Sequence, residues 1–107
     1  MKDIKFVDGK VSDHQGRGYI MYRKYEDGVY VMMGSYTEKE HRGKGVFKEC
    51  FERLLGIMKS GETLQAAACS KILAKYLEHK IGMKRIEHPV RHWGKISNGV
   101  DLEMVKP

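Results

Sequence analysis

Aromatic and β-branched residues are dense in two segments of the chain, residues 19–25 and residues 29–37. Such segments are typical of strands. Asp27-Gly28 lies between them, and this dipeptide is a strong hairpin signal when apolar segments flank it. The pattern therefore predicts two antiparallel strands joined by a tight turn.

Both ends of the chain carry weaker strand patterns. Near the start, the alternation of apolar and polar residues over 4–11 predicts a first strand with a polar turn at Gly9. Residues 12–18 predict a loop, because none of them is apolar. Near the end, residues 84–88 predict a strand and residues 100–105 a last edge strand, so that the final part of the chain is expected to form a hairpin-like pair.

The middle of the chain has a period of three to four residues, which predicts helices. One amphipathic helix is expected to begin near Gly45 and to end near Ser60-Gly61. Its apolar positions are Val46, Phe47, Cys50, Phe51, Leu54, Leu55 and Met58. A second helix is expected to begin at Ser70 and to end at Gly82, which suits a left-handed helix terminator. Its apolar positions are Ile72, Leu73, Tyr76, Leu77 and Ile81.

Between the two predicted helices, the short apolar segment 63–69 predicts a buried strand parallel to the strand 29–37, although its three alanines favour a helix. The order of elements predicts an α+β fold, with an α/β mixed sheet of about six to seven strands and two main helices. The chain has 107 residues, which suits a single domain over residues 1–107 with one core.

Composition narrows the kind of protein. Apolar residues make up 41% and charged residues 32%, as in ordinary globular domains. No apolar run is long enough to span a membrane, and the first residues lack the apolar core of a signal peptide, so a cytoplasmic location is expected. Cys50 and Cys69 lack the spacing of a metal site, which predicts reduced thiols and no metal. The net charge of +6 favours an anionic partner, either a phosphorylated cofactor or nucleic acid.

A basic, glycine-rich turn joins the strand 29–37 to the first predicted helix. Gly43 and Gly45 let the main chain turn sharply and approach a ligand closely, while Arg42 and Lys44 add positive charge. The N–H groups that begin the following helix favour negative charge at the same place. Such a tetrapeptide alone is usually a solvated turn. With a strand before it and a helix after it, the turn predicts a site for phosphate or pyrophosphate.

Two segments together suggest a family. Residues 37–45, Thr-Glu-Lys-Glu-His-Arg-Gly-Lys-Gly, resemble the acyl-CoA pyrophosphate loop of the GNAT superfamily of N-acyltransferases, whose motif is Arg/Gln-x-x-Gly-x-Gly/Ala. Arg42 and Gly45 match its first and fourth positions, while Phe47 replaces a small residue at the sixth. Residues 77–83 resemble the family's Leu-Tyr-x-Lys-x-Gly-Phe signature. The resemblance implies a short GNAT-like fold, without the two-helix segment that usually follows the first strand.

The resemblance implies an acyl-CoA-dependent N-acyltransferase, most often an N-acetyltransferase, in which an amine attacks the thioester of acetyl-CoA directly. Main-chain N–H groups of the basic turn would hold the pyrophosphate, and the pantetheine arm would lie along the end of the preceding strand, where two strands separate. Lys71 stands where the family frequently has an asparagine. The implied cofactor-binding residues are Ser35, Tyr36, Thr37, Arg42, Gly43, Lys44, Gly45, Val46, Phe47, Lys48 and Lys71.

The catalytic residues stay unassigned at this point. Many members of the family have a general-acid tyrosine where this chain has Glu78. Tyr76 lies about 200° around a helix from that position, so we expect it in the core rather than in the same role. The strand 29–37 contains no carboxylate. Candidate bases are therefore Glu38, Glu40, His41 or a water, and the candidates overall are Glu78, Tyr76 and Glu40.

Two other functions stay open. Residues 16–19 and 22–25 interleave basic and aromatic side chains, as in nucleic-acid binding proteins, but strand alternation would divide these residues between two faces. Alternatively, Phe47 and Glu78 suit a GNAT-fold module that binds acyl-CoA without transfer. Trp93 could border an acceptor site or pack on the sheet. The acceptor, a small molecule or a protein, is not specified, and a homodimer is expected only because similar proteins often form one.

Overall fold

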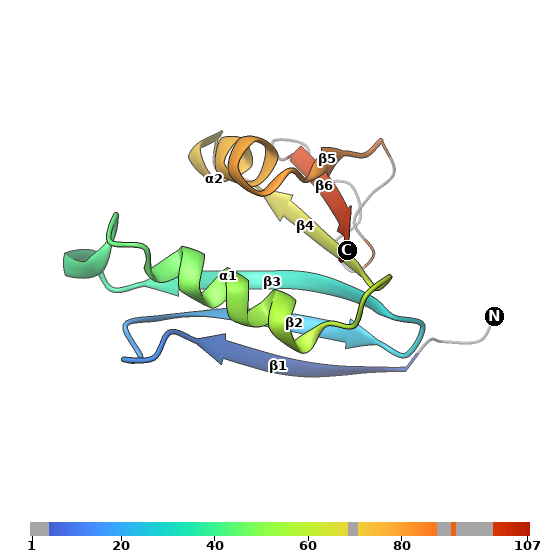
Figure 1. Ribbon diagram of the computed structural model, residues 1–107, viewed down its shortest axis with the longest axis horizontal. Coiled ribbons are helices and arrows are strands. Elements are labelled where there is room, and N and C mark those ends of the chain that lie inside the picture. The colour runs from blue at the N-terminus through green and yellow to red at the C-terminus, as the bar shows by residue number, and fades with distance from the viewer. Residues whose placement is uncertain (1–4, 69–70, 88–90, 92–99) are drawn as a thin grey trace.

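Six strands form one mixed sheet in the order β1-β2-β3-β4-β6-β5 (Figure 1). The computed structural model describes residues 5–68, 71–87, 91 and 100–107. The elements are β1 (Phe6–Ser12), β2 (Gly18–Tyr25), β3 (Val29–Thr37), α1 (Val46–Ile57), β4 (Thr63–Ala68), α2 (Lys71–Tyr76), β5 (Lys84–Arg85) and β6 (Val100–Val105). The predicted mixed sheet with two main helices is confirmed. No helix among these residues is long and apolar enough to cross a lipid bilayer.

Strands β1, β2 and β3 form an antiparallel meander, and the predicted Asp27-Gly28 turn joins the last two. The predicted turn at Gly9 is wrong, because β1 runs through this residue and Gly9 pairs with Tyr22. The Tyr22 ring lies over Gly9, where an added Cβ would be 2.4 Å from the ring atom Cζ. Glycine therefore admits a ring at this position instead of turning the chain. The loop predicted over 12–18 is shorter, because both of its end residues belong to strands.

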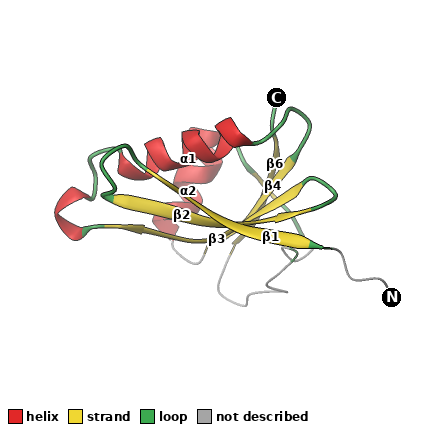
Figure 2. Ribbon diagram, turned by 90° about the horizontal axis from the view of Figure 1, so that it is seen from below, coloured by secondary structure: helices red, strands yellow, loops and turns green. Residues whose placement is uncertain are grey.

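The main core lies between one face of the sheet and the two helices, and Figure 2 shows α1 lying along that face. Its fully buried side chains include Ile20, Val46, Phe51, Leu54, Leu64, Leu77 and Leu102. Helix α1 starts after Gly45, as predicted, but ends at Ile57 because Met58 takes an extended ψ of 148°. The helix therefore stops before the predicted end at Ser60-Gly61. A small second cluster contains Tyr25 and Val31.

The second predicted helix has two parts. Helix α2 continues into a π-helical turn, Leu77–Ile81, which ends at Gly82 with a φ of 90°, the predicted left-handed terminator. Ile72 was expected in the core stripe, but it is 83% exposed. Ala74 and the predicted Leu77 are the buried residues of this segment, while Leu73, Tyr76 and Ile81 are partly buried against the core. The predicted start at Ser70 lies outside the described residues, as does Cys69.

The C-terminal strands confirm one prediction and correct another. Strands β5 and β6 pair antiparallel, as expected of a hairpin-like pair, although β5 is confined to Lys84–Arg85. Strand β6 is not an edge strand, because it lies between β4 and β5 and its Leu102 is fully buried. The Gln65 side chain on β4 donates to Glu103 Oε2 on β6 at 2.9 Å, which supports this central position. Trp93 lies outside the described residues.

Candidate functional site

Strands β3 and β4 separate where the candidate site begins. They pair in parallel from Val29 opposite Thr63 to Met32 opposite Ala66, and β3 then continues to Thr37 with β2 as its remaining paired strand. The β2–β3 ladder also shifts register beside this point, which leaves Met33 as an extra residue on β3. Such a bulge bends its strand and increases the local twist. The predicted parallel pairing is therefore confirmed, and it ends in two strands that diverge (Figure 1).

A groove of about 760 Å³ opens at this divergence. Its walls come from the end of β3, the basic turn, the first turn of α1 and one side of α2. The lining residues are Ser35, Tyr36, Thr37, His41, Arg42, Gly43, Gly45, Val46, Phe47, Lys48, Ile72, Leu73 and Tyr76. All the residues expected to bind the cofactor line this groove except Lys44 and Lys71, which are exposed outside it.

The basic turn has the conformation that its glycines allow. Gly43 and Gly45 both have a φ of 81°, in the left-handed region that other residues rarely adopt. A Cβ added at either position would meet no atom within 4 Å, so the space beside the turn is open. No side chain caps α1, and the first N–H to bond within the helix is that of Glu49, to Gly45 O at 3.0 Å. The N–H groups that precede Glu49 in the first turn have no partner within the helix.

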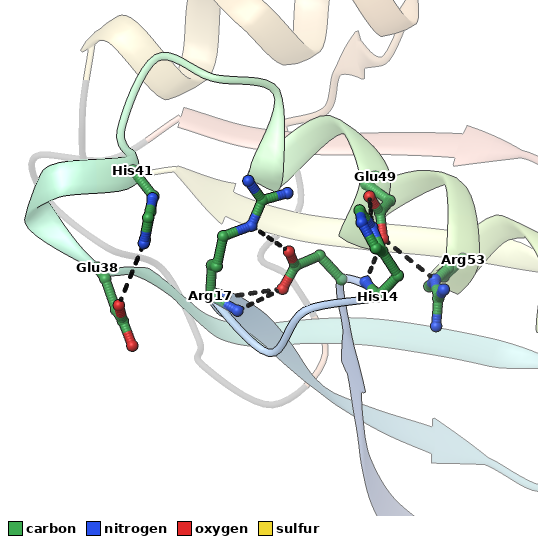
Figure 3. Close-up of polar contacts among 8 residues, drawn as sticks. His14, Arg17, Glu38, His41, Glu49 and Arg53 are labelled. Carbon is green, nitrogen blue, oxygen red and sulfur yellow. Dashed lines mark hydrogen bonds and ion pairs between the residues drawn. The ribbon is translucent and has the colours of Figure 1, made fainter.

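Polar contacts hold the turn against the end of β3. The Arg42 guanidinium donates through Nε to Thr37 O at 3.2 Å. Residues Lys39–His41 form a short 3-10 helix, and His41 Nε2 lies 3.6 Å from Glu38 Oε2 (Figure 3). These contacts fix where the cationic side chain of Arg42 and the imidazole of His41 meet the groove.

The other side of the groove is aromatic. The Phe47 ring packs on Phe51 with centroids 6.0 Å apart, and Tyr76 meets it edge-on at 5.6 Å. Phe47 thus points toward the core, so its bulk leaves the space beside the glycines open. Burial, followed by the charge of Glu52, raises the pKa of Tyr76 above its usual value. The Tyr76 hydroxyl is therefore protonated at neutral pH.

Solved structures share this fold. A proposed acyl-CoA N-acyltransferase from Klebsiella pneumoniae subsp. pneumoniae MGH 78578 superimposes with a TM-score of 0.72 at 16% sequence identity, over 95% of this chain and 73% of that protein. An acetyltransferase of the GNAT family from Staphylococcus aureus Mu50 gives a TM-score of 0.67 at 11% identity, over 94% of this chain and 68% of that protein. The chain has a GNAT N-acetyltransferase-like fold. No protein-family model and no curated protein matches the sequence, so the likeness concerns the fold.

Within this GNAT-like fold, the three catalytic candidates lie in different places. Glu78 is bound to Arg85, whose Nε lies 2.9 Å from Glu78 Oε1, and it does not line the groove. Glu40 is exposed and also lies outside the lining. Tyr76, expected in the core, is half-buried and lines the groove. The prediction that Tyr76 is a core residue is therefore right in part, because Tyr76 packs against the core and also lines the groove.

Sequence reasoning missed Ile72 and Leu73 as lining residues. Their apolar character was interpreted as core packing, and no local signal distinguishes a core residue from one that lines a groove. The distinction follows from the divergence of β3 and β4, where the groove opens beside α2.

The loop between β1 and β2 supports the first turn of α1. Asp13 accepts hydrogen bonds from the main-chain N–H groups of Arg17 and Gly18 at 2.6 and 3.1 Å, and from Arg17 Nε at 2.8 Å. Burial raises the pKa of Asp13, but these bonds outweigh it and lower the pKa to about 2. His14 is bound to Glu49 of α1 through its main-chain N–H and through Nδ1, the latter at 2.8 Å (Figure 3).

This cluster also brings potential metal-ligand atoms of Asp13, His14 and Glu49 within 4.8 Å of one another. The hydrogen bonds described above already use those atoms. Glu38 N–H donates to Arg17 O at 2.9 Å, so the same loop is also attached to the end of β3. The loop therefore braces both elements that flank the basic turn.

Proposed function

We propose that this protein is an acyl-CoA-dependent N-acyltransferase that moves an acetyl group from acetyl-CoA to an amine. The observation that carries the proposal is the left-handed turn at Gly43 and Gly45, which opens an uncapped helix start onto the groove beside diverging strands. An anion bound there would meet main-chain donors and the positive end of a helix dipole. The GNAT-like fold supports the same function.

The residues around the groove fit the parts of acetyl-CoA. The first-turn N–H groups of Val46, Phe47 and Lys48 would hold the pyrophosphate, and Arg42 would add charge. The exposed edge of β3 at Ser35 and Thr37 would hydrogen-bond the amide groups of the pantetheine arm, because β4 no longer pairs there. The net charge of +6 suits the anionic cofactor. Lys44 and Lys71 do not line the groove, but their positive charges would attract the anionic cofactor.

Acetyl-CoA supplies an activated thioester, at whose acyl carbon an amine forms a C–N bond as the C–S bond breaks. Positioning of the amine supplies a large part of the acceleration. A main-chain N–H near the bulge at Met33 would stabilise the developing negative charge on the acyl oxygen. Tyr76 holds a proton at its hydroxyl, which suits it to protonate the leaving sulfur. His41 follows the end of β3 beside the basic turn, whereas Met33 lies before that end, so in this proposal water accepts the proton of the amine.

The first experiment is isothermal titration with acetyl-CoA at two salt concentrations. We expect saturable one-to-one binding, and we expect Gly45→Asp to weaken it by at least about 100-fold, because a carboxylate would lie where the phosphates approach. The matched control is Gly61→Asp. Gly61 also has a positive φ, 89°, and open space beside it, but it lies far along the chain from the turn. Undiminished binding by Gly45→Asp would remove the cofactor site.

The same titration separates the alternatives. Binding without transfer to any amine acceptor would favour the inactive acyl-CoA-binding module. No binding at either salt concentration would exclude the acyltransferase and direct attention to nucleic acid, whose complexes weaken steeply with salt. Nucleic-acid binding is the less favoured alternative, because the positive charges of Arg17 and Arg23 are already paired with Asp13 and Asp8, respectively.

A further inference from the structure

The two edges of the sheet differ. One edge is β5, which contains only Lys84 and Arg85. The other is β1, which has seven residues in unbroken register with β2 and contains no proline. No described element pairs with its outer side. A long, regular edge strand of this kind is a template for another strand.

The hydrogen bonds at the two ends of β1 show which residues face outward. Glu26 N–H donates to Lys5 O at 3.0 Å, and Asp13 N–H donates to Gly18 O at 3.4 Å. Both Lys5 and Asp13 have odd numbers, and their bonds to Glu26 and Gly18 continue the β1–β2 register by one residue at each end. Because antiparallel pairing alternates along a strand, odd residues direct their N–H and C=O groups to β2, and even residues direct theirs to the free edge. The outward residues are Phe6, Asp8, Lys10 and Ser12.

The sequence of β1 is complementary to itself about Gly9. We propose that a second copy of this chain pairs with β1 in an antiparallel manner, around a two-fold axis at Gly9. In this register, Asp8 lies opposite the partner's Lys10, and Lys10 lies opposite the partner's Asp8. Both are outward-facing positions, so the two oppositely charged pairs coincide with the pairs that exchange main-chain hydrogen bonds.

Side chains on both faces fit this arrangement. Val7, which is 65% exposed, lies opposite the partner's Val11 at a position without hydrogen bonds, where side chains approach most closely. The Asp8 side chain is 58% exposed although Arg23 Nε lies 2.7 Å from it, so a second cation can reach it. Gly9 carries no side chain at the axis, and its own Tyr22 ring covers it on one face only. The interface is isologous, as expected of a closed dimer.

Charge reversal tests the register. We expect sedimentation velocity to show a concentration-dependent dimer for the unaltered chain. Asp8→Lys and Lys10→Asp should each raise the dissociation constant by at least about 10-fold, because each places two like-charged pairs across the axis. Mixing the two variants should restore association as a heterodimer, and the double variant Asp8→Lys with Lys10→Asp should restore the homodimer. Lys84→Asp, on the opposite edge, should have no effect.

Circular dichroism identifies any variant that fails to fold. If Asp8→Lys does not fold, Lys10→Asp still tests the register, because it keeps the ion pair between Asp8 and Arg23. A monomer at all concentrations would overturn the proposal. So would a dimer that both single reversals leave unchanged, since another surface would then form it. A folded double variant that stays monomeric would overturn the antiparallel register. None of these outcomes depends on acetyl-CoA binding.

Discussion

The two halves of strand β3 have opposite roles. In the first half, Tyr30, Val31 and Met32 are buried, with β2 paired on one side and β4 on the other. In the second half, Ser35 and Tyr36 are exposed, and β4 has turned away. The first half stabilises the fold, and the second half leaves main-chain groups available to a ligand. A single strand thus changes from core to candidate binding surface where one neighbour is lost.

The largest effect is expected in the first half of β3, where β4 pairs with it. Leu64 on β4 lies opposite Tyr30 and is fully buried, so Leu64→Ala should lower the free energy of unfolding by about 2–5 kcal/mol. Denaturant unfolding followed by circular dichroism measures this change. A loss below about 1 kcal/mol would mean that this half does not carry the stability of the sheet.

The next effect is expected in the groove. Tyr76→Phe removes the hydroxyl but keeps the ring against Phe47, so the fold should be unaffected and the rate of acyl transfer should fall by about 10²-fold. Steady-state kinetics at saturating acetyl-CoA measures the change in kcat. Glu78→Gln is the matched control, because Glu78 lies outside the groove lining and its loss should leave the rate unchanged across pH. Equal losses in both variants would contradict the role of Tyr76.

A smaller effect is expected in the loop between β1 and β2, which supports the second half of β3. Asp13 has a pKa of about 2, below its ordinary value of 3.8, so its charged form stabilises the folded state. This contribution is complete above about pH 4 and is lost as the pH falls toward 2. Asp13→Asn should therefore lower the melting temperature at neutral pH and narrow its difference from the unaltered protein as the pH falls. A constant difference from pH 7 to pH 2.5 would exclude this linkage.

The smallest effect is expected on the rim of the groove. Ile72 is 83% exposed, so Ile72→Ala should change stability by less than about 0.5 kcal/mol. It should nevertheless weaken acetyl-CoA binding by about 3-fold to 10-fold, because the side chain would lose apolar contact with the ligand. Titration calorimetry measures this, with Ile57→Ala, on the exposed side of α1, as control. Unchanged affinity would place the ligand away from α2.

Local signals in the sequence determined most of the elements. Alternating apolar residues and Asp27-Gly28 predicted the β2–β3 hairpin, and the period of α1 predicted its buried face. The glycines of the basic turn predicted a sharp turn of the main chain before α1, and both have a φ of 81° there. These features depend on residues close together in the chain, and short-range sterics and patterning suffice to specify them.

The tertiary structure decided what depends on distant partners. Alternation in β6 predicts an edge strand, but β4 and β5 both pair with it, and its Leu102 is fully buried. The sequence predicts a turn at Gly9, but Gly9 lies within β1, where the Tyr22 ring from β2 packs over it. Tyr76 lines the groove that opens where β3 and β4 diverge, whereas Glu78 lies outside its lining and is paired with Arg85. Each outcome rests on packing between segments far apart in the chain, which no local pattern encodes.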